Sequence, residues 1–598
     1  METLDREKSP TRRSGLLLLP LLILAALLAA PSTRGLLLTQ LRMRHNAAPF
    51  ASSPVVNALD ATAAKSEILP FVSAKEQQRI AAIVARFPND YAVQLGGALS
   101  AASRMPGSGT STPQENYAAF QREYGVRLAA VQARFPNRPG PYAHLLREMT
   151  LNTVRVSRDS EVEIFETGKR SFSVSDSQIG YADSWAAFDR AAAQGEQRDP
   201  DNAYFPLMRA IGLFDAKRDA EGIAAVLRAG QKTRFEDYSL EESDAEWTLS
   251  LHAYGPSSML VRQSIYSAVL LRHFAALRAL GRLTAYKAAQ AEREGRTQEG
   301  LALRHAMMQC ASRMRAQGSV LAALVGIAIV SIQTNRPGGV AVARPAADLT
   351  SEQRADGRRD RYLAYLHSIG ADEEARWFAQ LDAENRRARA LVQTAAENNL
   401  IDDATRPLPS LWMLDMLLLN NMLAMLILCA AGAGFGRLPG GRKRLLTLVI
   451  ALAALCLLVA LQMQWAEALT QVRAALDHLT LLSWDGGQKP GAFDMAGLVE
   501  KFPWMVHLGE VVFSLLAPAT ALLGMGILSA MRREKFTVAL ARGLQGGALI
   551  FATLLTVAYA AVLITTVHAE ARFGSVLDGL KRNGIVYLQS QAESTRKP

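Results

Sequence analysis

The chain has 598 residues, of which 49% are hydrophobic, and it carries a formal net charge of +11. This length exceeds one ordinary domain and supplies enough apolar side chains for both a buried core and membrane spans. The positive charge gathers in an N-terminal tail and in short loops beside apolar runs, without a basic stripe of stacking aromatics, which argues against nucleic acid as a partner. Of the three cysteines, Cys310, Cys429 and Cys456, two fall in apolar runs, so no internal disulfide is expected in the rest of the chain.

An export signal is predicted at the N-terminus. Lys8, Arg12 and Arg13 precede an apolar stretch that runs from Gly15 to Ala30. This order of charge and hydrophobicity is typical of a signal peptide, and it is equally compatible with an uncleaved membrane anchor. In both cases residues 1–32 deliver the following segment to the extracytoplasmic side.

Residues 33–401 predict an extracytoplasmic domain that is helical almost throughout. Ser73 and Glu76 form a capping box at the start of one amphipathic helix, which stops at Pro88. A second helix is expected between residues 112 and 136. Both end in the sequence Ala-Arg-Phe-Pro-Asn, and the recurrence of this end signal indicates a repeat array.

The segment from residue 185 to residue 230 has the clearest helix-turn-helix pattern, with an Asp-Pro-Asp-Asn connector at 199–202. Aromatic and small side chains occur at helical spacing on both sides of the connector, and the residues expected to pack are Trp185, Phe188, Ala191, Leu207, Ala210, Gly222 and Ala229. This segment resembles a tetratricopeptide repeat, although Gly222 stands where the family has alanine and the connector is several residues longer. The resemblance implies stacked helix pairs with a concave protein-binding surface, and it assigns no ligand residues.

Three further segments complete the region before the membrane. Residues 153–175 alternate apolar and polar side chains, which predicts either a hairpin or an irregular insertion between helices. The apolar run at 320–332 is shorter than the ~20 residues that a membrane crossing needs, so we predict a buried core helix there. Residues 402–410 form a linker.

Residues 411–568 predict a bundle of four transmembrane helices. The apolar runs cover residues 416–435, 445–464, 511–530 and 544–567, each near the ~20 residues that span a bilayer. The loops after the first and third runs are rich in arginine and lysine, and short basic loops stay in the cytoplasm. The domain 33–401, the loop 466–503 and the tail 569–598 are therefore expected outside the cytoplasm.

Small and polar side chains in the first of these spans indicate contacts between helices. Asn420 and Asn421 are expected to hydrogen-bond within the bundle, and Gly432 and Gly436 are expected to allow close packing.

The predicted fold is thus all-α, with an irregular tetratricopeptide-like array followed by transmembrane helices in a bacterial inner (cytoplasmic) membrane. No catalytic motif or cofactor site is found. No metal site is expected either, because the histidines lack zinc-like spacing. We expect the external array to bind or scaffold a protein or peptide partner, with membrane lipids as the other contact; the oligomeric state is open. Two alternatives are kept. One is a component of a transport or export system, and the other is an envelope enzyme with dispersed catalytic residues, for which a pocket would have to join His252 or His273 to carboxylates.

Overall fold

The computed structural model describes residues 11–44, 74–102, 113–152, 182–256, 273–339, 350–398, 407–437 and 536–594, with a few isolated positions between them. In these ranges the chain is all-α, as predicted, and it contains no strand beyond an isolated bridge between Asn202 and Arg234. The chain divides into two compact units. We call residues 73–249, 268–400 and 575–598 the large unit, and residues 1–72, 250–267 and 401–574 the apolar unit.

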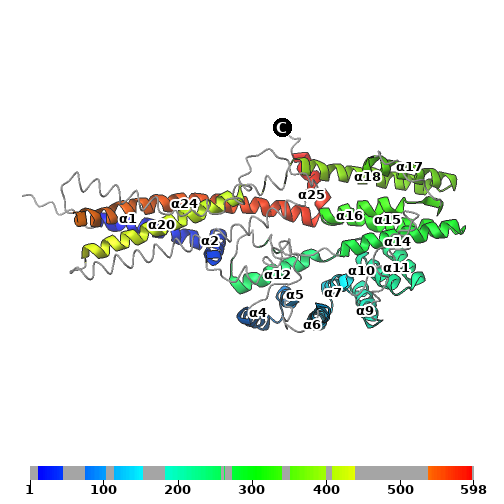
Figure 1. The fold of residues 1–598 in the computed structure, drawn as a ribbon, viewed down its shortest axis with the longest axis horizontal. Coiled ribbons are helices and arrows are strands. Elements are labelled where there is room, and N and C mark those ends of the chain that lie inside the picture. Colours follow the sequence, from blue (N-terminus) through cyan, green and yellow to red (C-terminus); the bar gives the residue numbers. More distant parts are fainter. Residues whose placement is uncertain are drawn as a thin grey trace, which may run out of the picture. The chain divides into compact units, whose positions relative to one another are not determined.

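The large unit is a succession of packed helices (Figure 1). Each helix from α4 to α11 packs against the next described helix along the chain, and α14, α15 and α16 pack against one another. Such neighbour-to-neighbour packing is compatible with a helical repeat array. The predicted hairpin or insertion at 153–175 lies outside the described residues. The helices are α4 (Ala74–Arg86), α5 (Tyr91–Ala102), α6 (Pro113–Arg134), α7 (Gly140–Asn152), α9 (Ala182–Arg198), α10 (Tyr204–Asp215), α11 (Asp219–Gln231), α12 (Ser239–Tyr254), α14 (His273–Arg293), α15 (Thr297–Gln317), α16 (Val320–Gln333), the 3-10 turn η1 (Pro337–Gly339), α17 (Ser351–Ser368), α18 (Asp372–Glu397) and α25 (Gly584–Ser594).

The first two helices predicted from their end signals are confirmed. α4 ends at Arg86 and α6 ends at Arg134, in both cases directly before the sequence Phe-Pro-Asn. Proline has no N–H to donate and disfavours helical backbone in the residue before it, which explains why both helices stop there. The end of α4 is completed by Gln94, whose Nε2 donates to the carbonyl oxygens of Val84 (2.7 Å) and Phe87 (2.9 Å).

Aromatic rings packed on glycines form part of the core of the large unit. Phe188 of α9 lies against Gly212 of α10, where an added Cβ would stand 2.7 Å from the ring. Phe214 lies in the same way against Gly222 of α11, at 3.0 Å. A side chain at either glycine would therefore displace a buried ring. Cys310 of α15 is also fully buried in this core, as a free thiol.

α16 is packed as a core helix, in agreement with the prediction for its short apolar run. It contacts α14 and α15, and eight of its residues are buried. Ser319 caps its start, because the Ser319 hydroxyl oxygen accepts a hydrogen bond from the N–H of Ala322 at 3.1 Å. Gly326 permits the close approach to α15, since an added Cβ would stand 2.4 Å from the carbonyl oxygen of Ala311.

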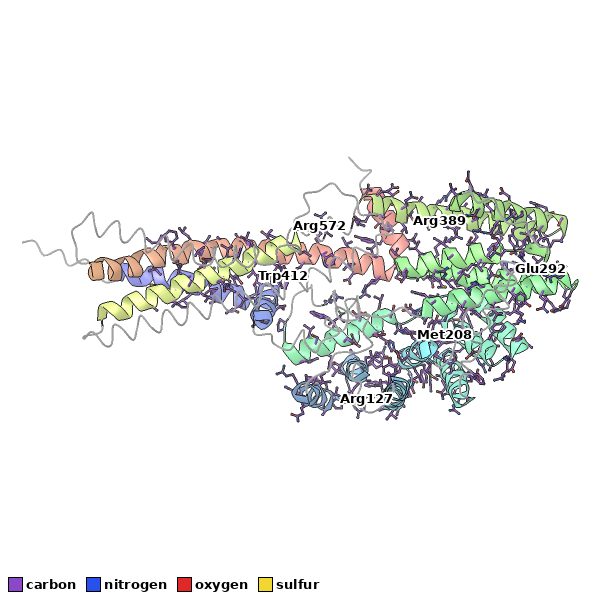
Figure 2. All side chains as sticks on the ribbon, in the orientation of Figure 1. Arg127, Met208, Glu292, Arg389, Trp412 and Arg572 are labelled. Atoms are coloured by element: carbon purple, nitrogen blue, oxygen red, sulfur yellow. The ribbon has the colours of Figure 1, made fainter. Side chains whose placement is uncertain are left out.

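An ion pair with both side chains excluded from solvent closes the end of α16. Arg304 of α15 donates from Nε to Oε1 of Glu292 of α14, at 2.7 Å (Figure 2 labels Glu292). The Arg304 guanidinium also donates to the carbonyl oxygens of residues 333, 335 and 336. Residue 333 is the last residue of α16, and the other two lie directly after the helix. Glu292 in turn accepts the N–H of Gly338 at 2.7 Å. Because buried charges persist only when they are paired and hydrogen-bonded, this pair fixes α14, α15, α16 and η1 together.

The C-terminal residues belong to the large unit. α25 packs against α15, α16 and α18. At its start the N–H of Gly584 donates to the carbonyl oxygen of Gly318, in the turn between α15 and α16, at 3.2 Å. An added Cβ on Gly584 would stand 2.4 Å from the backbone nitrogen of Val320, so only glycine permits this contact. The last turns of α24 precede this docked helix.

The apolar unit contains α1 (Thr11–Ala29), α2 (Pro31–Arg44), α20 (Leu408–Arg437) and α24 (Phe536–Arg582) up to Gly574. Within the described part of the chain, α24 is the helix that is long and apolar enough to cross a membrane by itself. The pair α1 and α2 meets the same criterion only if both are counted as one span, bent by 100°. The second and third predicted spans and the loop 466–503 fall in residues 438–535, which the structure does not describe.

α24 has two chemically different faces. From residue 550 to residue 564 its exposed large side chains are apolar, namely Ile550, Phe551, Leu554, Val557 and Ile564, whereas Thr565, His568 and Arg572 are exposed further along the helix. Its buried face carries polar groups among apolar ones and consists of Leu549, Ala552, Thr556, Tyr559, Leu563, Thr566, Glu570 and Phe573. A helix in water shows the opposite distribution, with its polar side chains outward.

Candidate functional site

The Asp-Pro-Asp-Asn connector between α9 and α10 forms a hydrogen-bonded hub for the segment 233–238. The fully buried Asn202 donates from Nδ2 to Asp199 Oδ2 (2.9 Å) and to the carbonyl oxygen of Glu236 (2.8 Å). Its Oδ1 accepts the backbone N–H groups of Tyr204 and Glu236, both at 3.0 Å. Each amide atom of this side chain is therefore paired, as a buried polar group requires.

The same hub holds the backbone of Tyr238 in an uncommon conformation. Its φ of 59° lies in the left-handed region that bulky residues rarely adopt. The Tyr238 hydroxyl donates to Asp199 Oδ2 at 2.5 Å, and Arg234 pairs with the other oxygen of the same carboxylate. The connector thereby fixes the turn from which α12 begins.

Asp237 stands at the start of α12 and joins two helices. Its Oδ1 accepts hydrogen bonds from the backbone N–H (3.0 Å) and from the hydroxyl (2.7 Å) of Ser239, the first residue of α12. The Asp237 carboxylate therefore caps the start of this helix. Its Oδ2 lies 3.0 Å from Nε2 of His273, the first residue of α14. Burial raises the pKa of Asp237, but its hydrogen bonds and the charge of Arg147 outweigh burial and hold this pKa below its ordinary value. Burial lowers the pKa of His273, so we assign a neutral ring that donates from Nε2.

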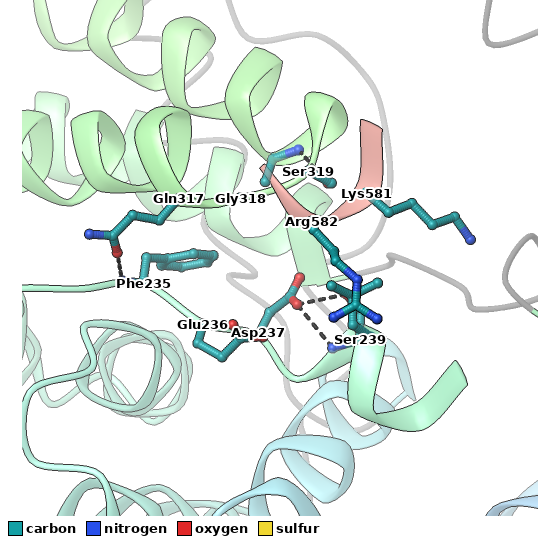
Figure 3. A pocket seen from close by; sticks show the side chains of 11 residues that line it. Phe235, Glu236, Asp237, Ser239, Gln317, Gly318, Ser319, Lys581 and Arg582 are labelled. Carbon is teal, nitrogen blue, oxygen red and sulfur yellow. Dashed lines mark hydrogen bonds between the residues drawn. The ribbon is translucent and has the colours of Figure 1, made fainter. Parts of the chain in front are cut away.

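Asp237 also lines a small pocket that is open to solvent and has a cavity volume of about 20 Å³ (Figure 3). The start of α12, the α15–α16 turn and the last residues of α24 form its walls. Glu236, Asp237, Lys581 and Arg582 are among the lining residues; the side chain of Lys581 extends away from the others, and Arg582 Nη2 lies 3.4 Å from Asp244 Oδ2. Burial and the neighbouring Asp237 raise the pKa of Glu236 above its ordinary value. A cavity of this volume has room for about one water molecule, so it is too small to hold a substrate.

The pocket does not assemble a nucleophile with a base. In a serine hydrolase the histidine stands between serine and aspartate, so that it can take the proton from the hydroxyl. Here Asp237 stands in the middle, and the Ser239 hydroxyl donates to the carboxylate instead of to His273. The ring of His273 is fully buried and is not part of the pocket wall. The condition set for the enzyme alternative is thus met only in part: the carboxylate and the histidine are adjacent, but the histidine cannot reach a ligand in the pocket.

A second buried polar group ties α7 to α12. Arg147 Nη2 lies 2.5 Å from Oε2 of Glu242 and 2.5 Å from Nδ1 of His144. Tyr204 of α10 adds a third helix, because its hydroxyl donates to the carbonyl oxygen of Ala143 at 3.2 Å. The Arg147–His144 contact lies within α7, and the other two contacts cross between helices, so this cluster stabilises their packing.

The residues expected to pack in the repeat-like segment lie on α9, α10 and α11. Phe188, Ala191, Leu207, Ala210 and Ala229 belong to the main hydrophobic core, with Trp185 packed against it. Trp185 also donates from Nε1 to Asp215 Oδ2 at 2.8 Å. Gly222 meets the ring of Phe214, as described above. The structure therefore brings these residues together through three successive helices.

The four residues proposed to pack inside the membrane lie on α20. Asn420 and Asn421 are buried, and Asn421 Nδ2 donates to the carbonyl oxygen of Leu417, in its own helix, at 2.8 Å. Gly432 and Gly436 are part of α20, but their surroundings lie beyond what the structure describes.

Two carboxylates that the sequence analysis did not single out lie between α20 and α24. Trp412 donates from Nε1 to Oε1 of Glu570 at 2.8 Å, and the Thr566 hydroxyl donates to Oδ2 of Asp415 at 2.6 Å. Asp415 and Glu570 are both buried. Their position at the edges of two predicted apolar runs was the available signal, since an ionisable residue there indicates a helix contact.

Within the described part of the chain, no group of three or more metal-ligating side chains gathers. Comparison with models of protein families, with curated proteins and with solved structures gives no match for this chain.

Proposed function

We propose that the chain is a membrane-anchored envelope protein whose large unit binds or scaffolds a protein partner. The single observation that carries the anchoring is the distribution of side chains on α24. Polar groups such as Thr556, Thr566 and Glu570 face the protein, and large apolar side chains such as Phe551 and Leu554 face outward. This arrangement is stable where the surroundings are hydrocarbon, and it would be costly in water.

The docking of α25 supports an even number of membrane crossings between the two parts of the large unit. Residues 268–400 and residues 575–594 pack together, so they share one side of any membrane that α24 crosses. Four spans between them satisfy this requirement, with the basic loops in the cytoplasm and the large unit outside it.

Scaffolding is favoured over catalysis by the way the large unit uses its polar groups. Asp237, Asn202 and Arg304 hold helices together through hydrogen bonds between elements. The helices from α4 to α11 pack neighbour to neighbour, as in the tetratricopeptide-like arrays that the segment 185–230 resembles. Arrays of this kind present an extended surface to a protein or peptide ligand.

Photo-crosslinking in intact cells tests where the partner binds. A photoreactive amino acid is introduced separately at Val126 of α6 and at Ile369, both exposed in the large unit, and at Leu554 on the exposed face of α24. We expect the same protein to be captured from one or both positions of the large unit, and lipid to be captured from Leu554. Capture of the partner from Leu554 alone would contradict scaffolding by the large unit.

Labelling with a membrane-impermeant thiol reagent tests the orientation. Single cysteines introduced at Glu373 and Glu593 should react in cells whose outer membrane is permeabilised and whose inner membrane is intact. Both residues are exposed and belong to the large unit. A cysteine at Arg442, in the first basic loop, should react only after the inner membrane is broken. Labelling of Glu373 and Glu593 from opposite sides would refute the proposed topology.

The buried carboxylates of the apolar unit favour one second candidate, a component of a transport or export system. Asp415 and Glu570 are ionisable groups between apolar helices, which is where proton and ion pathways place such groups. In that case the D415N and E570Q variants should retain the partner and lose the transport phenotype of the intact system. If the chain acts only as a scaffold, both variants should retain the partner and also the phenotype of the intact system.

A further inference from the structure

Three arginines of α17 form a continuous basic face. Arg354, Arg358 and Arg361 occupy positions i, i+4 and i+7, which lie on one side of a helix. Arg354 and Arg361 are exposed, and Arg358 is partly buried against α16, where its Nη2 donates to the hydroxyl oxygen of Ser331 at 3.2 Å. We call these three residues the arginine face.

No described carboxylate forms an ion pair with the arginine face, although its neighbours are well paired. Arg359, one position further along α17, lies 2.8 Å from Asp356, and Arg386 of α18 lies 3.1 Å from Asp382. Among the described residues, acidic partners therefore pair with Arg359 and Arg386, and none pairs with the arginine face.

A fourth arginine, Arg389 of α18 (Figure 2), adds its charge to the same region. Burial, together with the charges of Arg361, Arg354 and Arg389, lowers the pKa of Arg358 below its ordinary value. These like charges thus lie close together with no counter-charge from the described residues, which costs free energy. Binding of an anion would relieve this repulsion.

The shape of the arginine face indicates an elongated ligand. Seven residues of helix extend over about 10 Å, so three guanidinium groups are spread along a line instead of converging on one point. Gly357 leaves the helix surface bare within this line, and the position of its absent Cβ lies 3.5 Å from Nη1 of Arg361. Guanidinium groups bind carboxylates through paired hydrogen bonds, so a row of carboxylates would match this row of arginines.

We propose that the arginine face is the docking surface for an acidic segment of the protein partner. This inference rests on the proposed scaffolding function and names the chemistry of the ligand. Charge complementarity of this kind gives specificity and a fast, salt-dependent association.

The test measures binding of fluorescent poly-L-glutamate to the purified full-length protein by anisotropy, at low and at moderate salt. The triple variant R354Q/R358Q/R361Q should bind about tenfold more weakly, and its binding should depend less on salt. The matched control R296Q/R359Q/R386Q loses the same charge from arginines that already have carboxylate partners, and it should bind within about twofold of the wild type. Because the arginine face carries unrelieved repulsion, the first variant should unfold at the same or a higher temperature than the wild type.

Equal loss of binding in both triple variants would overturn the inference, since net charge alone would then explain it. Binding of polyphosphate but not of poly-L-glutamate would also overturn it, in favour of a phosphate polymer. If a partner cross-links equally to the wild type and to R354Q/R358Q/R361Q, the arginine face is not its docking surface. The proposed scaffolding function would then be unaffected. Selective loss of poly-L-glutamate binding supports the arginine face even if the wild type captures no partner, which would count against scaffolding alone.

Discussion

Replacing Arg304 with methionine removes the buried charge that holds the end of α16. The variant leaves Glu292 without its counter-ion in a site closed to solvent, and three carbonyl oxygens of the segment 333–336 lose a donor. Removing one member of a buried, hydrogen-bonded ion pair costs about 3–5 kcal/mol. For a unit of this size, such a loss lowers the unfolding midpoint by roughly 5–15 °C.

The assay is thermal unfolding of the full-length protein in detergent, followed by far-ultraviolet circular dichroism. The matched control is R296M. Arg296 precedes the same helix, α15, and is also paired with two carboxylates, Glu294 and Glu299, but it is exposed. Exposed pairs contribute little to stability, so the control should keep the wild-type midpoint.

A second comparison separates the ion pair from simple packing. In the variant E292L/R304M both charges are gone, so no unpaired carboxylate is buried, and we expect it to be more stable than R304M alone. An R304M midpoint equal to that of R296M would refute the conclusion that this pair fixes α14, α15 and α16. Strict additivity of the two substitutions would refute the coupling between them.

Three other perturbations test separate parts of the structure. Gly326→Ala places a Cβ 2.4 Å from the carbonyl oxygen of Ala311 and should destabilise the large unit by about 1–3 kcal/mol in urea unfolding, whereas an unchanged midpoint would mean that α15 and α16 are less closely packed. Asp237→Asn should cost about 2–3 kcal/mol at pH 7, through loss of the charged cap and of the bond to His273. Because the pKa of Asp237 is lower in the folded state than in the unfolded state, the advantage of the wild type is fully present above about pH 4 and should shrink as the pH falls below it; a constant difference down to pH 3 would contradict this assignment. Trp412→Phe removes the indole N–H that reaches a carboxylate of α24 and should lower the midpoint of the apolar unit by a few degrees, measured by the fluorescence of the remaining tryptophans.

Local signals in the sequence were sufficient to predict several of the helices. The stops before Pro88 and Pro136 place the ends of α4 and α6, and the length of the apolar run at 320–332 indicates a core helix, which α16 is. These predictions succeed because the signal and the structure that it specifies lie within one helix. The basic face of α17 is equally local, since its spacing of four and three residues is visible in the sequence.

The contacts of the candidate site could not be predicted from local sequence patterns. Asp237 meets a histidine 36 positions further on, and Arg304 meets carbonyl groups about 30 positions away, through helices whose packing no local pattern specifies. The segment 199–202 was identified as a connector, but its role as a hub depends on the return of residues 233–238. In the same way, the partners of Asp415 and Glu570 are more than 150 positions distant in the sequence.

The free sulfur of Cys310 bears on how the large unit responds to oxidants. Burial raises the pKa of this thiol to about 12, so almost none of it is thiolate near neutral pH, and the thiolate is the form that attacks a disulfide. Once the unit has folded, oxidants and disulfide-exchange enzymes have no access to this atom. The folded large unit should therefore tolerate an oxidising compartment, and it should be purifiable without a reducing agent and without forming linked dimers through this residue.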